Sequence, residues 1–164
     1  MYEFFIALAF TLPLFVSAQD CNLKKGKDNF NNKGKLSSGF VTFQDVSLST
    51  DADAYEIDFF FLINFPADKC FDENSEATVM FEGGKLTADY ANNGPTNCKG
   101  IFHMIFKNSA YTPSALQKLC TKKIIAIKFK DSNEKLTTLN FSPEQQALFM
   151  KMANCISTEA KTLR

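Results

Sequence analysis

Histidine and arginine are almost missing from this 164-residue sequence, and their scarcity removes several functional classes. Arg164 is the only arginine, and arginine supplies the bidentate contacts to phosphates and base edges that nucleic-acid recognition uses. We therefore expect no nucleic-acid partner. His103 is the only histidine, so any Cys-His pair or Ser-His-Asp triad would have to use it. It lies between Ile101 and Ile105 in a strand-like pattern, which favours a half-buried structural histidine.

Other catalytic and cofactor motifs are missing too. No serine lies in a Gly-x-Ser-x-Gly motif, and no two cysteines have the Cys-x-x-Cys spacing of zinc sites and thioredoxin-like redox centres. Gly83-Gly84 falls where a hairpin turn is expected, not between a strand and a helix where a phosphate-binding loop would lie. The sequence therefore predicts no cofactor and no metal site, and it favours a non-enzymatic protein.

The first 18 residues, MYEFFIALAFTLPLFVSA, have the pattern of a secretory signal peptide. An apolar run precedes a small-residue cleavage site that ends at Ala18. Pro13 interrupts this run, which is shorter than the roughly 20 residues of a membrane span. A signal peptide is thus favoured over a membrane anchor, although Glu3 stands where basic residues are usual. We expect export to the periplasm or the extracellular space, with no membrane span after cleavage.

The rest of the chain has the length of one ordinary domain. Removal of Glu3 with the signal leaves 18 Lys and Arg against 17 Asp and Glu, so bulk charge steers no partner. Residues 19–38 are polar and rich in Lys, Asn and Gly, and we expect an extended or loosely ordered lead-in there. A single domain is predicted over residues 39–164.

The stretch at residues 55–65, YEIDFFFLINF, is expected to be the central strand. One face is apolar throughout: Tyr55, Ile57, Phe59, Phe61, Ile63 and Phe65. On the other face, Glu56 and Asp58 give way to Phe60 and Leu62. This pattern predicts a strand whose second face becomes buried halfway along, under a helix or another sheet.

Turn and capping signals place the remaining elements. Gly83-Gly84 predicts a two-residue turn joining strands at 77–82 and 85–90. The alternation in 39–49 slips near Gln44 and Asp45, which predicts a β-bulge or a short bend. Further strands are expected at 101–107, 123–130 and 135–141, and helices after Thr112-Pro113 and Ser142-Pro143. The sequence predicts an α+β fold, a mainly antiparallel meander of hairpins covered by a short helix and an amphipathic C-terminal helix.

Five cysteines follow the signal. If strands 55–107 pair consecutively, Cys70 and Cys98 lie in loops at one edge of the sheet. Cys120 and Cys155 lie on the apolar stripes of the two helices. We expect Cys70–Cys98 and Cys120–Cys155 disulfides, with Cys21 free or intermolecular, although four cysteines allow three connectivities. A reduced, buried Cys120 and Cys155 is the alternative.

Acidic residues gather in two clusters, Asp51, Asp53, Glu56 and Asp58, then Asp68, Asp72, Glu73 and Glu76. The first begins like a calcium loop, but Glu56 occupies the sixth position, which requires glycine. We interpret this cluster as solvated charge at a strand end. If the sheet carries a surface site, it is predicted at Glu56 and Asp58.

The last third of the chain has an apolar strand, a capped helix and a late cysteine, in LCTKKIIAIKFKD (from Leu119) and NFSPEQQALFMKMANCI. These features resemble the ends of many small exported proteins of bacterial envelopes that have no assigned role. The resemblance implies a similar sheet-and-helix end and an exported location. It implies no functional residues.

The leading functional hypothesis is a non-enzymatic exported module that binds an unknown protein or small ligand through a sheet edge, a loop end or a surface patch. One alternative is a small secreted hydrolase that uses acidic residues such as Asp58 or Asp72. Another is a lipid carrier, because 14 phenylalanines follow the signal and would line a cavity.

Overall fold

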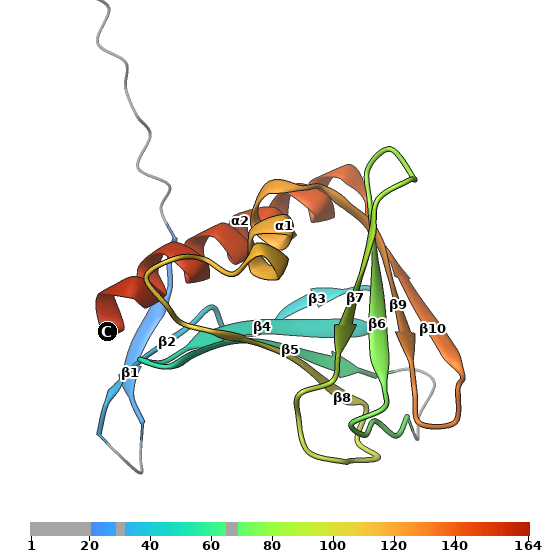
Figure 1. Ribbon diagram of the computed structural model, residues 1–164, viewed down its shortest axis with the longest axis horizontal. Coiled ribbons are helices and arrows are strands. Elements are labelled where there is room, and N and C mark those ends of the chain that lie inside the picture. The colour runs from blue at the N-terminus through green and yellow to red at the C-terminus, as the bar shows by residue number, and fades with distance from the viewer. Residues whose placement is uncertain (1–20, 29–31, 65–68) are drawn as a thin grey trace, which may run out of the picture.

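The computed structural model describes residues 21–28, 32–64 and 69–164, and these form an α+β fold (Figure 1). The described strands build two antiparallel sheets. The first has the order β1 (Lys24–Lys27), β2 (Gly34–Ser37), β4 (Val46–Ala52), β5 (Glu56–Ile63) and β8 (Ile101–Lys107), with β3 (Val41–Phe43) on β4. The second has the order β10 (Leu136–Asn140), β9 (Ile124–Lys130), β6 (Glu76–Phe81) and β7 (Thr87–Ala91). The predicted fold class is confirmed.

Two helices fill the angle between the sheets, both on the same side of the first sheet (Figure 1). They are α1 (Ser114–Thr121) and α2 (Pro143–Glu159), the latter extended by a 3₁₀ turn, η1 (Ala160–Leu163). The predicted capping box is present, so the backbone N–H groups of Ser142 and Gln145 at the start of α2 are both satisfied. No described helix is long and apolar enough to cross a membrane.

The β6–β7 hairpin forms in the predicted register, with Ala77 opposite Tyr90 and Val79 opposite Ala88. Gly83 and Gly84 both have positive φ, the conformation that a two-residue turn of this kind needs. Local turn chemistry and face patterning therefore suffice to define this hairpin.

The long-range pairing differs from the predicted meander. The β6–β7 hairpin belongs to the second sheet, and β5 pairs directly with β8 instead. Gln44 and Asp45 form a hairpin turn between β3 and β4, not a bulge, because Phe43 pairs with Val46 across them. The lead-in is also part of the domain, since β1 and β2 form a hairpin that extends the first sheet and buries Leu36.

Phenylalanine side chains fill the core between the sheets and α2. Among the described residues, those that are almost completely buried are Phe43, Phe59, Phe61, Phe71, Phe81, Phe102, Phe129 and Phe149. Their rings pack edge to face or tilted, as where Phe61 and Phe102 each contact Phe129 with centroids 5.2 and 5.4 Å apart. Burial of each ring contributes about 2–3 kcal/mol, which makes this cluster the main stabilising element of the fold.

Two disulfides are present, and one differs from prediction. Cys70 bonds to Cys98, the predicted pair, but Cys155 bonds to Cys21 and Cys120 is a buried free thiol. Cys120 donates to the carbonyl of Ala153 at 3.3 Å. Ser157 of α2 also forms a hydrogen bond with Cys120. Because an α-helix turns by about 100° per residue, Cys155 lies about 200° around α2 from Ser157. The predicted Cys120–Cys155 bond is wrong because these cysteines meet opposite edges of the buried stripe of α2.

Tyr90 anchors α1 to β7, because its hydroxyl donates to the carbonyl of Ala115 at 2.9 Å. Burial, with a smaller contribution from the nearby Cys120, raises the pKa of Tyr90 to about 12. We expect Tyr90→Phe to lower the free energy of unfolding by about 1 kcal/mol at neutral pH.

The same substitution should also change how the free energy of unfolding depends on pH in the alkaline range. The neutral phenol of wild-type Tyr90 is favoured by folding, so its contribution is complete below pH 10 and is lost as the pH rises towards 12. Urea unfolding of both proteins between pH 8 and 12 measures this. The gap between wild type and Tyr90→Phe should close across that window, and a constant gap would contradict the assignment.

Candidate binding surface on the first sheet

The first sheet has one face packed on the core and helices and one face turned away from them, which we call the outer face. The alternation of β4, β5 and β8 assigns to it Ser47, Ser49, Asp51, Glu56, Asp58, Phe60, Leu62, Ile101, His103, Ile105 and Lys107. The helix or second sheet predicted to cover Phe60 and Leu62 is not there in the described part of the chain (Figure 1). Both side chains are only half-buried.

Asp58 and His103 form a contact at the centre of the outer face. The Oδ2 atom of Asp58 lies 2.7 Å from Nδ1 of His103, and the two side chains are 26% and 15% exposed. The other carboxylate oxygen, Oδ1, is buried and has no hydrogen-bond partner among the described residues. His103 is thus the half-buried strand histidine that the sequence predicts, and its partner is one of the two predicted site residues.

A loop after β7 holds His103 from the other side. The side chain of Asn92 accepts a hydrogen bond from the backbone N–H of His103, and the N–H of Asn93 donates to the carbonyl of His103. Gly94 lies directly against the imidazole ring, where a Cβ atom would be 2.3 Å from Cδ2. Any side chain at residue 94 must therefore displace the ring or the loop.

We expect Gly94→Ala to destabilise the protein by about 1–3 kcal/mol, as overpacking does elsewhere. The substitution should also move the His103 ring away from Asp58, which a shift of its Cδ2–H and Cε1–H resonances in NMR spectra would report. Gly26, where a Cβ would meet nothing within 4 Å, is the matched control, and Gly26→Ala should leave these resonances in place. Unchanged imidazole resonances in Gly94→Ala would contradict the geometry.

Aromatic rings continue the outer face beyond His103. The Phe60 ring packs edge to face on the imidazole with centroids 4.8 Å apart, and Phe40 packs on Phe60 at 5.6 Å. Phe40 directly precedes β3, lies outside the core and is 61% exposed. The three rings form a stepped apolar ridge with the Asp58 carboxylate at one end.

The first acidic cluster comes together at that end. Asp51 lies directly opposite Asp58 in the β4–β5 register, and both line a shallow hollow of about 130 Å³ with Asp53, Glu56 and Lys35. The Asp51 carboxylate accepts from Ser49. No group of three His, Cys, Asp or Glu side chains in the described ranges is placed to hold a metal ion. The hollow therefore adds a charged border, mostly acidic, to one end of the apolar ridge.

The second acidic cluster has structural roles. Asp72 caps a turn by accepting from the Ser75 hydroxyl and the Asn74 N–H, and the Ser75 bond is the main cause that lowers the pKa of Asp72. Glu76 forms an ion pair with Lys130 at 2.7 Å. Asp68 lies outside the described residues. These acids are not directed to a common point.

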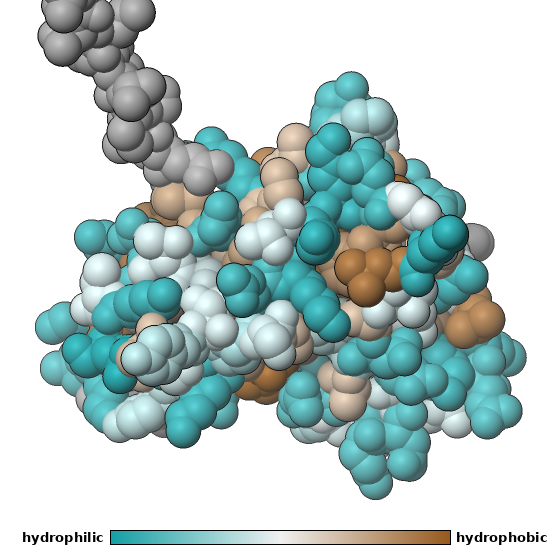
Figure 2. Space-filling model, turned by 45° about the horizontal axis from the view of Figure 1, so that its top comes forward, coloured by the Kyte–Doolittle hydropathy of each residue, from teal (hydrophilic) through white to brown (hydrophobic). Residues whose placement is uncertain are grey.

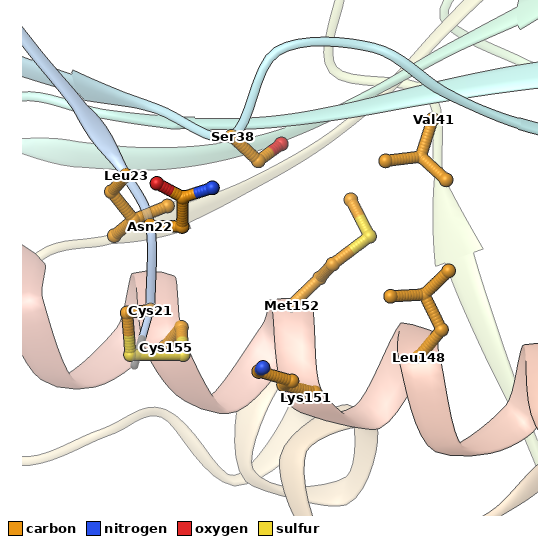
Figure 3. A pocket seen from close by; sticks show the side chains of 9 residues that line it. All are labelled: Cys21, Asn22, Leu23, Ser38, Val41, Leu148, Lys151, Met152 and Cys155. Atoms are coloured by element: carbon orange, nitrogen blue, oxygen red, sulfur yellow. A yellow bond between two sulfur atoms is a disulfide. The ribbon is translucent and has the colours of Figure 1, made fainter. Parts of the chain in front are cut away.

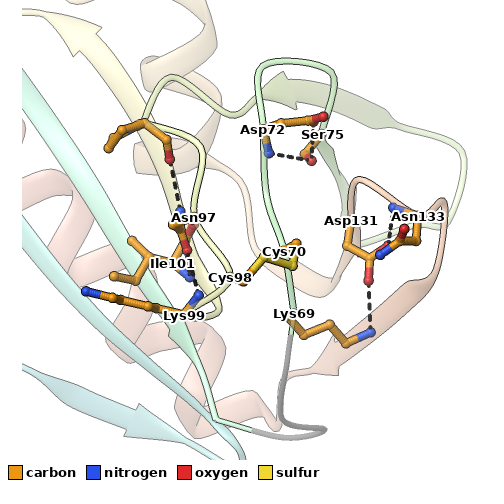
Figure 4. Close-up of a disulfide and its surroundings, with 11 residues drawn as sticks. Lys69, Cys70, Asp72, Ser75, Asn97, Cys98, Lys99, Ile101, Asp131 and Asn133 are labelled. Carbon is orange, nitrogen blue, oxygen red and sulfur yellow. Dashed lines mark hydrogen bonds and ion pairs between the residues drawn. A yellow bond between two sulfur atoms is a disulfide. The ribbon is translucent and has the colours of Figure 1, made fainter.

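The loop end beside this cluster is a braced structural region (Figure 4). The Cys70–Cys98 disulfide joins two loops, and Asn97 accepts from the N–H groups of Lys99 and Ile101. Nearby, the buried Lys69 ammonium pairs with Asp131 at 3.5 Å. The polar groups of this loop region bond to one another within the protein, so we assign no ligand site to the region.

Sequence reasoning located half of the outer-face site. It singled out Glu56 and Asp58, but it gave His103 only a structural role, expected Phe60 to be covered and gave Phe40 no role. The missing signal is the β5–β8 pairing, which places Phe60 opposite His103. Tyr55 also differs from expectation: it precedes β5 and is 59% exposed, so it does not share the buried face of that strand. Phe65 lies outside the described residues.

The fold and the site define a disulfide-bonded α+β protein with a two-sheet core and one uncovered, partly aromatic sheet face. Comparisons with family models, with curated proteins and with solved structures found no match to this chain. Function is therefore inferred from the residues of the outer face.

Proposed function

We propose that this protein is an exported, non-enzymatic module that binds a protein partner through the outer face of its first sheet. One observation carries the proposal: apolar side chains stand at outward positions of two adjacent strands, β5 and β8, and no helix or second sheet of the described chain covers them. They are Phe60, Leu62, Ile101 and Ile105, each half-buried, with the exposed Phe40 beside them. Uncovered apolar and aromatic groups of this kind mark interaction surfaces.

The opposite side of the molecule gives a useful contrast. With the helix side tilted toward the viewer, Figure 2 presents mostly hydrophilic and neutral residues, and hydrophobic ones occur in small separate groups. Scattered apolar residues need no explanation, whereas a group that spans two paired strands does. The contrast supports the outer face as the binding surface.

Rim chemistry narrows the class of partner. The ridge of Phe40, Phe60 and His103 ends at the carboxylates of Asp51 and Asp58, and only Lys35 brings positive charge to that hollow. A complementary surface would place apolar side chains on the ridge and Lys or Arg on the acidic end. We therefore propose a partner that presents an apolar segment flanked by basic residues.

Capture on immobilised protein tests this function. Phe40→Ser should abolish retention of a partner from the compartment where the protein resides, because it removes the most exposed anchor of the ridge. Tyr111 is 89% exposed and serves as the matched control, so Tyr111→Ser should retain the partner as wild type does. Retention by both variants, or loss by both, would reject the outer face.

Export is part of the proposal, and two features support it. The first 18 residues have a signal-peptide pattern, and disulfides such as Cys21–Cys155 and Cys70–Cys98 are typical of oxidising compartments. We expect the intact mass of protein isolated from its producing cells to match a chain that begins at Gln19 with two disulfides. A chain that retains residues 1–18 would contradict export by a cleaved signal.

The second candidate is a small secreted hydrolase, which the Asp58–His103 contact favours. A carboxylate at Nδ1 is the arrangement that orients a histidine as a general base. However, Ser49 is separated from His103 by Phe60 in the register, and its hydroxyl already donates to Asp51. Asp58→Asn should abolish any hydrolytic activity, whereas Asp72→Asn should not. An activity that survives Asp58→Asn removes this candidate.

A carrier with a phenylalanine-lined cavity receives less support. The phenylalanines of the core pack against one another, as Phe59 does against Phe106 and Phe149. The cleft lined by Leu148 and Met152 has a volume of about 200 Å³ and no phenylalanine in its lining. This cleft therefore gives no support to a carrier whose cavity is lined by phenylalanines.

A further inference from the structure

A cleft lies between α2 and the strands at the start of the chain, on the helix side of the first sheet and away from the outer face. Nine residues line it: Cys21, Asn22, Leu23, Ser38, Val41, Leu148, Lys151, Met152 and Cys155. Its volume is about 200 Å³. The Cys21–Cys155 disulfide joins its two walls covalently, so the width of the cleft is fixed at Cys21 (Figure 3).

One wall is a single stripe of α2. Leu148, Lys151, Met152 and Cys155 follow one another at i, i+3, i+4 and i+7, which places them on one side of the helix. The opposite side of α2 faces α1, where Cys120 contacts Ala153. Among the described residues, those that line the cleft opposite this stripe are Cys21, Asn22, Leu23, Ser38 and Val41, and none of them belongs to α1.

The cleft has a polar end and an apolar end (Figure 3). Asn22 and Ser38 lie together at one end, Val41 and Leu148 approach each other at the other, and Met152 points into the space between them. Ser38 is already satisfied, because its hydroxyl donates to Gly39 and accepts from Thr50. Asn22 has no hydrogen-bond partner among the described residues, so its amide is available to a ligand.

Charge in the lining has one sign only. Lys151 is exposed and forms no ion pair within the described ranges, and no carboxylate lines the cleft. An anionic head group would be attracted to Lys151 and could accept from the Asn22 amide. A methylene chain would lie along Met152, Leu148 and Val41, where it loses contact with water.

We propose that this cleft binds a free short-chain alkyl carboxylate, with its head group at Lys151 and Asn22 and its chain toward Val41 and Leu148. Clefts of about 300–1,000 Å³ hold drug-sized ligands, so 200 Å³ accommodates a shorter molecule. The chain length is therefore limited by the end of the cleft at Val41 and Leu148.

Titration with hexanoate, octanoate and decanoate, followed by NMR of the Met152, Leu148 and Val41 methyl groups, tests the proposal. Affinity should rise about fourfold for each methylene that enters the cleft and then level off once the cleft is full. Below the micelle concentration, unchanged methyl resonances with all three acids would overturn the proposal. A rise without levelling, or binding to phospholipid vesicles in place of the free acids, would also overturn it.

Lys151→Gln tests the head group without disturbing the fold. It should weaken octanoate binding about two- to fivefold, as exposed ion pairs do, and leave octanol binding unchanged. Lys128 is also exposed, on β9 and outside the cleft, so Lys128→Gln is the matched control and should change neither affinity. Equal effects of the two substitutions on octanoate, or no effect of Lys151→Gln, would reject a carboxylate ligand. Val41→Trp should fill the apolar end and weaken octanoate and octanol alike, by at least tenfold.

Discussion

Replacement of both Cys21 and Cys155 by serine is expected to lower the free energy of unfolding by about 5 kcal/mol. The reason is chain entropy, since this disulfide closes a loop with a sequence separation of 134 residues, and the loss grows with the logarithm of that number. The double variant also frees the segment before β1 from α2, so the cleft wall should open. Urea unfolding without reductant, monitored by circular dichroism, measures the change.

Two further variants show whether the effect belongs to this bond. Cys70→Ser with Cys98→Ser removes the cross-link that closes a loop with a sequence separation of 28 residues. The same chain-entropy model predicts that this lowers the free energy of unfolding by about 1.4 kcal/mol less than loss of the Cys21–Cys155 bond does. Cys120→Ser keeps a donor for the Ala153 carbonyl and should cost much less than either. If Cys120→Ser proves as costly as Cys21→Ser with Cys155→Ser, Cys120 is a disulfide partner and the assigned connectivity is wrong.

Lys69→Met is expected to lower the free energy of unfolding by about 3–5 kcal/mol. The side chains of Lys69 and Asp131 are only 6% and 3% exposed, and the substitution would leave the Asp131 carboxylate buried without its counterion. Asp131 retains two bonds, because its Oδ1 accepts from the N–H groups of Asn133 and Lys135 at 2.9 Å. Those bonds hold the β9–β10 turn but supply no compensating charge. Thermal and urea unfolding give the measurement.

A second substitution separates charge from packing. Asp131→Asn in the Lys69→Met background removes the unpaired charge while its side-chain oxygen still accepts from the turn, so it should recover a large part of the loss. Lys130→Met breaks the exposed ion pair with Glu76 and should have little effect by comparison. A double variant no more stable than Lys69→Met would show that the ammonium acts through packing alone.

The parts of the fold predicted correctly are those that local chemistry defines. Gly83 and Gly84 fix the register of the β6–β7 hairpin, and Ser142 with Gln145 fixes the start of α2. Strand order is not defined by local chemistry in this way. The backbone N–H and C=O groups along the edge of β6 can pair with β9 as well as with β5. Nothing between Phe60 and Ile101 in the sequence indicates that β5 selects β8, so the division into two sheets was missed.

The same limit explains which site residues were found. Glu56 and Asp58 were identified because they interrupt an apolar alternation, and that signal is local. His103 lies beside Asp58 because of the β5–β8 register, and Cys21 lies beside Cys155 because of the path of the chain past α2. Both contacts are long-range, so no local pattern indicates them. Phe60 and Leu62 were expected under a cover that the described chain does not provide. That mismatch between an apolar pattern and an uncovered face is the main evidence for a binding surface.

Site-directed photo-crosslinking tests the central claim, that the partner occupies the outer face. A photoreactive phenylalanine analogue would be placed singly at four exposed apolar residues distributed over the molecule: Phe40, Leu86, Tyr111 and Leu136. Each variant would be expressed in the producing cells, irradiated and analysed for covalent adducts by mass. The proposal predicts a specific adduct at Phe40 and none at the other three. Adducts at Leu86, Tyr111 or Leu136 with none at Phe40 would contradict it.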